Sequence, residues 1–588
     1  MAMTDRMPGI LKLAVKRLSA LARILSIAAL AAPLATCSAP PAQSSAAKVP
    51  ITTRSPEARR EFVVGRDLSE KLRATDAREH FEQAVRLDPD FALGYLGLAT
   101  TAPSPLDVFP AMRRAAELAP RASPGEGHLI QAAIAAANGQ TEVQAKELQA
   151  LVASFPDDER VRFSLGVLYY ARQEFDRAID EFQHAIRIDP DYSPPYNLMG
   201  YALRNLERYE RAEEAFRKYI ELIPDEPNPY DSYAELLMKE GRFRDSIAEY
   251  QRALDVNPNF MDSYIGMGND YIFLGQYEMA RKCFTKLAYL ARNDGERRRA
   301  LTSMASSYIH EGRYDEALAA ISKRLEIAHG ADDRVAMSAD LNLLGTILLG
   351  AGRPDEAGQK YQESVEMMDR AVITSQVKER TRRFLVANAA RVALAKGDIP
   401  SATALAEKHR ALVKNTSNFD EVWFSHLVFG QIALARRDWK QAALELEQAN
   451  QQNPRVLYLE AQAYVGLGRT AEARTSCARA ALYNGLDLNY GFVRNAALKL
   501  LAELENSTPK TKELGRGPRP RESCAPELGR RREARRSPNL RRGLEGCGEP
   551  DELPLRPGLA DESDPDGKTE AVACRHRHAR VAGNRRRR

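Results

Sequence analysis

Residue types that could catalyse a reaction or bind a metal occur in this sequence, but not at the spacings that such chemistry requires. The six cysteines are scattered and none forms a CxxC pair, so neither a zinc ribbon nor a thioredoxin-like redox centre is indicated. There is no GxxxxGK(S/T) phosphate loop, no GxSxG nucleophile turn and no HExxH zinc motif. The His-Arg-His run after Cys574 lies among arginines, which favours a solvated basic segment over a metal site. We expect no catalytic residue, no cofactor, no metal and no small-molecule substrate.

The first 36 residues have the layout of an export signal. Five basic residues precede an apolar run from Ile24 to Ala35. This run is too short to span a bilayer, which takes ~20 residues, but it suits the hydrophobic core of a signal peptide. The segment that follows, 37–54, is rich in Ala, Pro and Ser, and we predict that it is a flexible tether.

The apolar run ends in Leu34-Ala35-Thr36-Cys37, which resembles the lipobox of bacterial lipoprotein signal peptides, although Thr36 departs from the usual Gly, Ala or Ser. That resemblance implies cleavage before Cys37, lipidation of this cysteine, and anchoring to a membrane of the bacterial cell envelope through several acyl chains. Ser38 behind the cysteine resembles lipoproteins sent to the outer membrane, where they face the periplasm. The alternatives are a secreted protein, and a cytoplasmic protein whose leader is an amphipathic helix.

One unit recurs from residue 55 to residue 506, and its clearest copies are spaced by 34 residues. Prolines end successive units, alanines share one position, and an aromatic residue stands four positions further on. The residues concerned are Pro190, Pro224, Pro258, Ala178, Ala212, Ala280, Phe182, Phe216, Tyr250 and Phe284. Gly166, Gly200 and Gly268 stand where two helices must approach closely, and Gly241, Gly275 and Gly312 mark turns between paired helices.

This pattern resembles the tetratricopeptide repeat. The resemblance implies an all-α fold, a right-handed superhelical solenoid of antiparallel helix pairs, with disordered N- and C-terminal segments. We count about eleven or twelve units over 55–506, sharpest at 58–91 and 159–294, and ending in a capping helix. The wider spacing of Gly312, Gly352 and Gly397 predicts longer helices in that part.

In this family the first helix of each pair lines a concave groove, which implies where a partner would bind. The residues predicted to form this groove are Arg160, Phe163, Tyr170, Asn197, Tyr201, Arg204, Asn205, Asn228, Asp231, Glu235 and Asn269. Asparagine amides can hold the backbone of an extended peptide, and tyrosine rings can receive its side chains. The alternative is that these residues only form a solvated inner face. The lysine–asparagine clamp with which some family members hold acidic chaperone tails is missing, so such a tail is not the expected ligand.

Residues 507–588 differ in composition from the body of the chain. They hold 21 basic and 13 acidic side chains and no Phe, Tyr or Trp, so they cannot bury a core and are predicted to be disordered. A basic arm, a solvated linker and a shifted reading frame are all compatible with this composition. Because no aromatic residue is available to stack on bases and the leader predicts export, nucleic acid is not an expected partner.

These patterns together favour a non-catalytic scaffold that is exported, lipid-anchored and binds a peptide or protein partner in its groove. A second interpretation is a tetratricopeptide lipoprotein that captures a glycan or nutrient, which would require insertions that shape a sugar site, and none is evident. A third is a cytoplasmic regulatory scaffold. The repeats predict the fold but do not identify the partner.

Overall fold

The computed structural model describes residues 48–506. These residues form 25 α-helices and one 3-10 helix, and no β-strand occurs among them. Helices α1 to α24 make twelve consecutive antiparallel pairs, each packed on the next, and α25 follows. The prediction of an all-α solenoid of helix pairs is therefore confirmed.

The first six pairs consist of short helices. They are α1 Pro56–Glu70, α2 Ala74–Leu87, α3 Ala92–Thr100, α4 Pro105–Leu118 (followed by the 3-10 helix Ala119–Arg121), α5 Pro124–Ala137, α6 Thr141–Ser154, α7 Glu159–Ala171, α8 Phe175–Ile188, α9 Pro194–Asn205, α10 Tyr209–Leu222, α11 Asn228–Lys239 and α12 Phe243–Val256.

The later pairs include the longest helices of the array, from α15 to α19, where the spacing of the turn glycines predicted longer helices. The later helices are α13 Met261–Phe273, α14 Tyr277–Leu290, α15 Asp294–Glu311, α16 Tyr314–Gly330, α17 Arg334–Gly350, α18 Pro354–Arg370, α19 Ser375–Ala395, α20 Ile399–Val413, α21 Phe419–Ala435, α22 Trp439–Glu447, α23 Pro454–Gly466, α24 Thr470–Ala481 and α25 Leu488–Asn506.

Glycine and an aromatic ring set the distance between the helices of a pair. A Cβ atom on Gly166 would lie 2.5 Å from the ring of Phe182, and one on Gly200 would lie 2.7 Å from the ring of Phe216. Both rings are fully buried. A larger residue at either glycine would therefore push the two helices apart, which explains why the sequence repeats this combination.

The turns within pairs depend on backbone conformations that glycine adopts easily. Gly241, Gly275 and Gly312 follow first helices and have φ values of 77°, 75° and 79°. Each lies in the left-handed region, where a side chain would be strained. The predicted turns at these glycines are confirmed.

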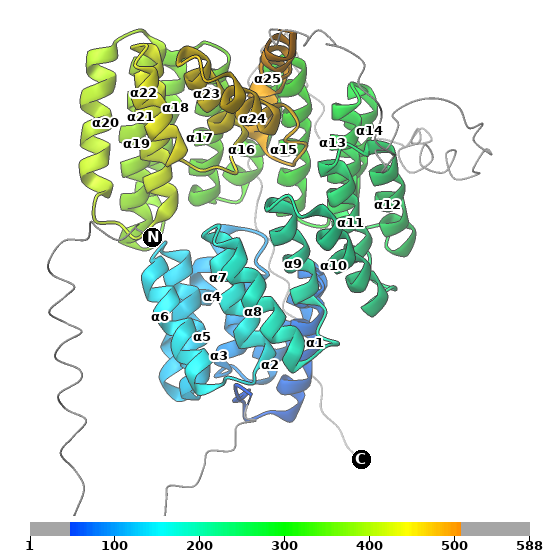
Figure 1. Ribbon diagram of the computed structural model, residues 1–588. Helices are drawn as coiled ribbons and strands as arrows, with labels where there is room; N and C mark the ends of the chain where they lie inside the picture. Colours follow the sequence, from blue (N-terminus) through cyan, green and yellow to red (C-terminus); the bar gives the residue numbers. More distant parts are fainter. Residues whose placement is uncertain (1–47, 507–588) are drawn as a thin grey trace, which may run out of the picture.

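The array coils so that later pairs lie over earlier ones. Figure 1 shows α1 to α8, in blue to teal, below α17 to α24, in green to brown, with α11 to α14 joining the two levels. Gln173 donates a hydrogen bond to Asn450 at 2.7 Å, and Thr374 donates one to Asn138 at 2.6 Å. These bonds join residues more than 200 positions apart, so the two superhelical levels contact each other directly.

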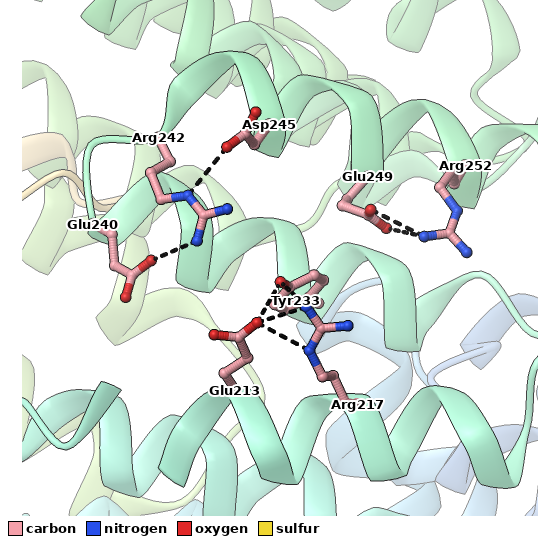
Figure 2. A network of polar contacts seen from close by, with 8 residues as sticks. All are labelled: Glu213, Arg217, Tyr233, Glu240, Arg242, Asp245, Glu249 and Arg252. Carbon is pink, nitrogen blue, oxygen red and sulfur yellow. Dashed lines mark hydrogen bonds and ion pairs between the residues drawn. The ribbon is translucent and has the colours of Figure 1, made fainter. Parts of the chain in front are cut away.

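The solvent-facing side of the middle pairs carries ion pairs within and between neighbouring helices. Figure 2 shows Arg217 with Glu213 on α10, and Arg252 with Glu249 on α12. The side chains of both arginines are more than half exposed, at 63% and 54%. Exposed pairs of this kind contribute little to stability, so this surface serves mainly solubility.

Candidate functional site

The predicted groove residues lie on α7, α9, α11 and α13, the first helices of four successive pairs. Several of them bond to one another across neighbouring helices, so they form one continuous polar face. The bonds run from Asn205 to the Tyr170 hydroxyl (3.2 Å), from Asn197 to Asn228 (3.2 Å), from Arg204 to Glu235 (3.0 Å), and from Ser263 to Asp231 (2.7 Å).

Part of this face is deeply buried and already hydrogen-bonded within the solenoid. Asn197, Asn228, Asp231 and Asn269 are each at most 6% exposed. The side-chain oxygen Oδ1 of Asn228 accepts hydrogen bonds from the side chain of Asn197 and, at 2.9 Å, from the hydroxyl of Tyr219. The side-chain amide of Asn269 donates to a backbone carbonyl of its own helix. In this arrangement Asn197, Asn228 and Asp231 help to fix the spacing of the first helices.

The accessible part consists of Tyr170, Tyr201, Arg204, Asn205 and Glu235, which are only half-buried. The guanidinium of Arg204 lies over the ring of Tyr201, 4.6 Å from its centroid. Burial alone would lower the pKa of Arg204. The carboxylate of Glu235, together with Tyr201 and Tyr170, has the larger effect and raises this pKa above its ordinary value. Arg204 therefore stays charged.

Arg160 and Phe163 lie at the α7 end of the face. Arg160 forms an ion pair with Glu70, at the end of α1, with 2.8 Å between Nε and Oε1. Its guanidinium also lies 4.8 Å from the centroid of the Tyr192 ring, and Phe163 meets the same ring edge-on. This end of the face is thus linked to the first helix pair. None of these contacts tests whether a partner binds, so the groove assignment stays a prediction.

A small pocket opens where the concave face meets the C-terminal part of the chain. It has a volume of about 200 Å³, and Arg204, Asn205, Lys239, Arg479 and Tyr483 are among its lining residues. The ammonium of Lys239 donates to the backbone carbonyl of Tyr483 at 2.7 Å. Burial, together with the neighbouring Arg204, lowers the pKa of Lys239 to about 8.

The C-terminal helix α25 and the loop before it also pack on this side of the array, a position that the sequence did not predict. Three side chains of this segment donate to backbone carbonyls at the ends of successive first helices, α11, α13 and α15. The bonds run from Asn484 to Lys239 (3.4 Å), from Arg494 to Phe273 (3.1 Å) and from Asn495 to His310 (3.4 Å). Helix α25 and the loop before it therefore supply donors to carbonyls at three helix ends, where intrahelical partners run out.

Residues 48–54 form the opposite end of the described chain, and they lie as an extended segment along the turn between α2 and α3 and the starts of α5 and α7. Their side chains alternate between half-buried and exposed positions. The backbone N–H groups donate to three carboxylates. The bonds run from Val49 to Asp158 Oδ2 (2.8 Å), from Thr52 to Glu126 Oε1 (2.7 Å) and from Arg54 to Asp88 Oδ2 (3.0 Å).

Each of these carboxylates uses its other oxygen to accept a nearby backbone N–H. Asp158 and Glu126 do so at the starts of α7 and α5, whereas Asp88, the C-cap of α2, does so in the turn that leads to α3. The local bonds run from Arg160 to Asp158 Oδ1 (2.9 Å), from Ser123 to Glu126 Oε2 (2.8 Å) and from Asp90 to Asp88 Oδ1 (3.1 Å). The tether predicted over 37–54 therefore includes seven residues that are bound to the solenoid. Sequence reasoning missed these contacts because each carboxylate also fits an ordinary helix cap.

Several predictions fall outside the described residues. These are the export signal over 1–36, the lipidated Cys37 and the tail over 507–588. Within 48–506, no helix combines the length and apolar character that crossing a membrane requires. The same residues contain no group of His, Cys, Asp or Glu side chains arranged to hold a metal ion.

Comparison with known families supports the repeat assignment. Models described as tetratricopeptide repeat match residues 296–370, residues 129–193 and 427–487, and residues 193–226 and 262–294. Among curated proteins, the chain is 31% identical over 194 residues to the peroxisomal targeting signal receptor of Candida glabrata, and 41% identical over 66 residues to that of Komagataella phaffii. These alignments cover 32% and 11% of this chain, and only 27% and 11% of the two receptors.

Two solved structures that resemble this chain match about a third of it or less. MamA from Desulfovibrio magneticus is 16% identical, and the match covers 28% of this chain and 94% of that one with a TM-score of 0.25. YrrB, described as a TPR protein with an unusual peptide-binding site, is 18% identical, and the match covers 33% and 98% of the two chains with a TM-score of 0.22. On the family matches and the helix pairs together, this chain is a solenoid that contains tetratricopeptide repeats.

Proposed function

We propose that this protein is a non-catalytic scaffold that binds a peptide or protein partner on the concave face of its solenoid. The observation that carries this proposal is the half-buried group of aromatic, amide and charged side chains formed by Tyr170, Arg204, Asn205 and Lys239 beside the pocket. Such a mixture can receive both the backbone and the side chains of a polypeptide. The similarity to receptors for a targeting signal supports a polypeptide as the partner class.

Export and lipid anchoring through Cys37 form the second part of the proposal. Their support comes from the leader sequence alone, with its basic start, apolar run and lipobox-like end. In this interpretation the protein works in the cell envelope, and Ser38 behind the cysteine favours the periplasmic face of an outer membrane. Radiolabelled palmitate should enter the wild-type protein and not a Cys37→Ser variant. Equal labelling of the two proteins, or labelling of neither, would remove this part of the proposal.

The binding proposal is tested by capture from a solubilised envelope extract on the immobilised full chain. The test variant combines Asn205→Ala with Lys239→Gln, which changes the accessible edge of the face while leaving its buried asparagines in place. The control variant combines Glu249→Gln with Arg252→Gln on the solvent-facing side shown in Figure 2. A partner retained by the wild type and the control, and lost by the test variant, supports the concave face. A partner retained equally by all three proteins contradicts it.

A further inference from the structure

The contacts of residues 48–54 show how this solenoid binds an extended polypeptide at the start of a helix. A carboxylate caps its own helix with one oxygen and accepts a backbone N–H from the extended segment with the other. In addition, half-buried side chains such as Val49 and Ile51 pack against neighbouring apolar residues. The binding unit is thus a carboxylate with one oxygen available, next to an apolar surface.

The start of α17 repeats this unit without an occupant. Asp333 caps α17, because its Oδ1 accepts the N–H of Ala336 at 2.9 Å. Its Oδ2 is buried and has no hydrogen-bond partner, and the residue as a whole is only 3% exposed. A buried carboxylate oxygen without a donor costs free energy, so a group that supplied an N–H would bind favourably there.

Asp333 differs in this respect from the residues that cap the neighbouring first helices. The starts of α15, α21 and α23 are capped by Asn293, Asn418 and Asn453, each through Oδ1. An asparagine has an amide nitrogen where aspartate has a second oxygen, so these caps offer no further acceptor of this kind. Helix capping alone does not require a carboxylate at residue 333, since asparagine caps a helix equally well.

A pocket with both apolar and charged lining residues, Arg113, Arg334 and Arg370 among them, lies beside Asp333, between α4 and the loop that joins α18 to α19. It has a volume of about 170 Å³, and Leu106, Phe109, Asp333 and Val372 are among its lining residues. Leu106 is 52% exposed and Val372 is 84% exposed, a high exposure for side chains of this type. The pocket therefore combines the two elements that hold Val49, an apolar surface and a carboxylate oxygen.

We propose that this pocket binds an extended segment of a partner protein. A backbone N–H of the segment donates to Oδ2 of Asp333, and a neighbouring branched aliphatic side chain packs on Leu106, Phe109 and Val372. The site lies between the two superhelical levels and not on the concave face. It is thus a second polypeptide-binding site, independent of the one in the proposed function.

The probe is a fluorescent peptide with the sequence of residues 49–53, Val-Pro-Ile-Thr-Thr, blocked at both ends and therefore uncharged. Its binding to the full chain is followed by fluorescence anisotropy. The test variant is Asp333→Asn, which keeps the helix cap and removes the free oxygen. The matched control is Asp315→Asn, in the first turn of α16 and outside the pocket, where the carboxylate side chain is 88% exposed. A second test variant, Val372→Asp, changes the apolar wall without touching the cap.

We expect saturable binding to the wild type and to Asp315→Asn. Binding to Asp333→Asn should be about tenfold weaker, as expected for the loss of one hydrogen bond to a charged group. Binding to Val372→Asp should weaken as well. A photo-reactive leucine in place of the peptide's isoleucine should crosslink to α4 or to residues 370–373. Thermal melting of each variant establishes that α17 remains folded.

Three results would overturn the proposal. The first is the absence of saturable binding to the wild type at millimolar peptide. The second is equal binding to Asp333→Asn and Asp315→Asn. The third is crosslinking confined to the starts of α5 and α7, which would mean that the peptide only displaces residues 49–53 from their own site. If the full chain instead dimerises and Asp333→Asn abolishes the dimer, the occupant is a second copy and not a partner.

Discussion

The two ends of the described chain both fold back onto the solenoid, but they are held by different forces. Residues 48–54 are half-exposed and are held by backbone N–H groups that donate to carboxylates. Helix α25 is held by buried aromatic rings, with Tyr490 fully buried among Phe273, His310 and Tyr483. The first end resembles a bound peptide, whereas the second resembles a part of the core.

This difference predicts how each end contributes to stability. Hydrogen bonds to half-exposed groups contribute about 1 kcal/mol each, because the unfolded chain makes equivalent bonds to water. A buried aromatic side chain contributes more, since its removal leaves a cavity that the surroundings fill only in part. We therefore expect residues 48–54 to exchange with solvent more readily than α25.

The largest effect should come from Tyr490→Ala. This change removes a fully buried ring and the hydroxyl that donates to Ala481 at 2.7 Å. We expect a loss of about 3–5 kcal/mol in the free energy of unfolding, measured by urea denaturation. Amide exchange should rise along α25 and at the ends of α13 and α15. A loss below 1 kcal/mol (about the value of one exposed bond) would remove the contrast between the two ends.

The second prediction concerns pH. Burial, with a smaller contribution from Arg494, lowers the pKa of His310 to about 3, below its ordinary 6.5. The unfolded chain therefore binds a proton more readily than the folded chain between these values, so stability falls as pH falls through that range. The loss attributable to His310 should approach roughly 1 kcal/mol per pH unit.

Denaturation between pH 7 and pH 4 checks this prediction in the wild type, in His310→Gln and in His184→Gln. His184 is exposed and serves as the control. The pH dependence should weaken in His310→Gln and stay unchanged in His184→Gln. If both variants keep the wild-type slope, the docking of α25 does not depend on a neutral His310.

A smaller effect is expected at the other end of the chain. Asp158→Asn should keep the cap of α7 but weaken the bond from Val49, at a cost of about 1 kcal/mol. Protection of the Val49 amide against hydrogen exchange should fall, and that of Tyr490 should not. The neighbouring Asp157→Asn changes an exposed carboxylate and should alter neither amide. Equal loss of protection at both amides would show that the two ends unfold together.

The smallest effect should come from the solvent-facing ion pairs of Figure 2. Arg252→Gln breaks the pair with Glu249, in which the arginine side chain is 54% exposed. We expect the free energy of unfolding to change by less than about 0.5 kcal/mol, since water and salt screen such a pair. A calorimetric comparison with the wild type provides the measurement. A change as large as that of Asp158→Asn would mean that exposed charges matter here as much as the contacts of residues 48–54.

Much of the fold could be predicted because the residues that pack and turn each repeat stand at fixed positions within it. The pairing of Gly166 with Phe182, and of Gly200 with Phe216, recurs at one sequence offset and corresponds to one packing contact. The turn glycines need a left-handed backbone, which glycine adopts with least strain. Such constraints act within one or two units, so they are visible as a period in the sequence.

The candidate site was less predictable, for a physical reason. The family geometry placed Asn197, Asn228 and Arg204 on the first helices, where the structure has them. Whether each side chain is accessible depends on bonds between helices that are 31 residues apart, such as that from Asn197 to Asn228. A periodic pattern gives the position of a residue on its helix but not the partner that covers it.

The all-helical array of repeats could be predicted from the sequence alone. Neighbouring units bury each other's apolar faces, so the residues that make these contacts recur at a regular spacing along the chain. The tertiary structure was needed to show that residues 48–54 lie on the turn between α2 and α3 and on the starts of α5 and α7. It was also needed to show that α25, with the loop before it, covers the ends of α11, α13 and α15. These contacts join residues up to 245 positions apart. They depend on the coiling of the whole solenoid. Every unit adds a small rotation, and the total rotation cannot be predicted from the pattern within one unit.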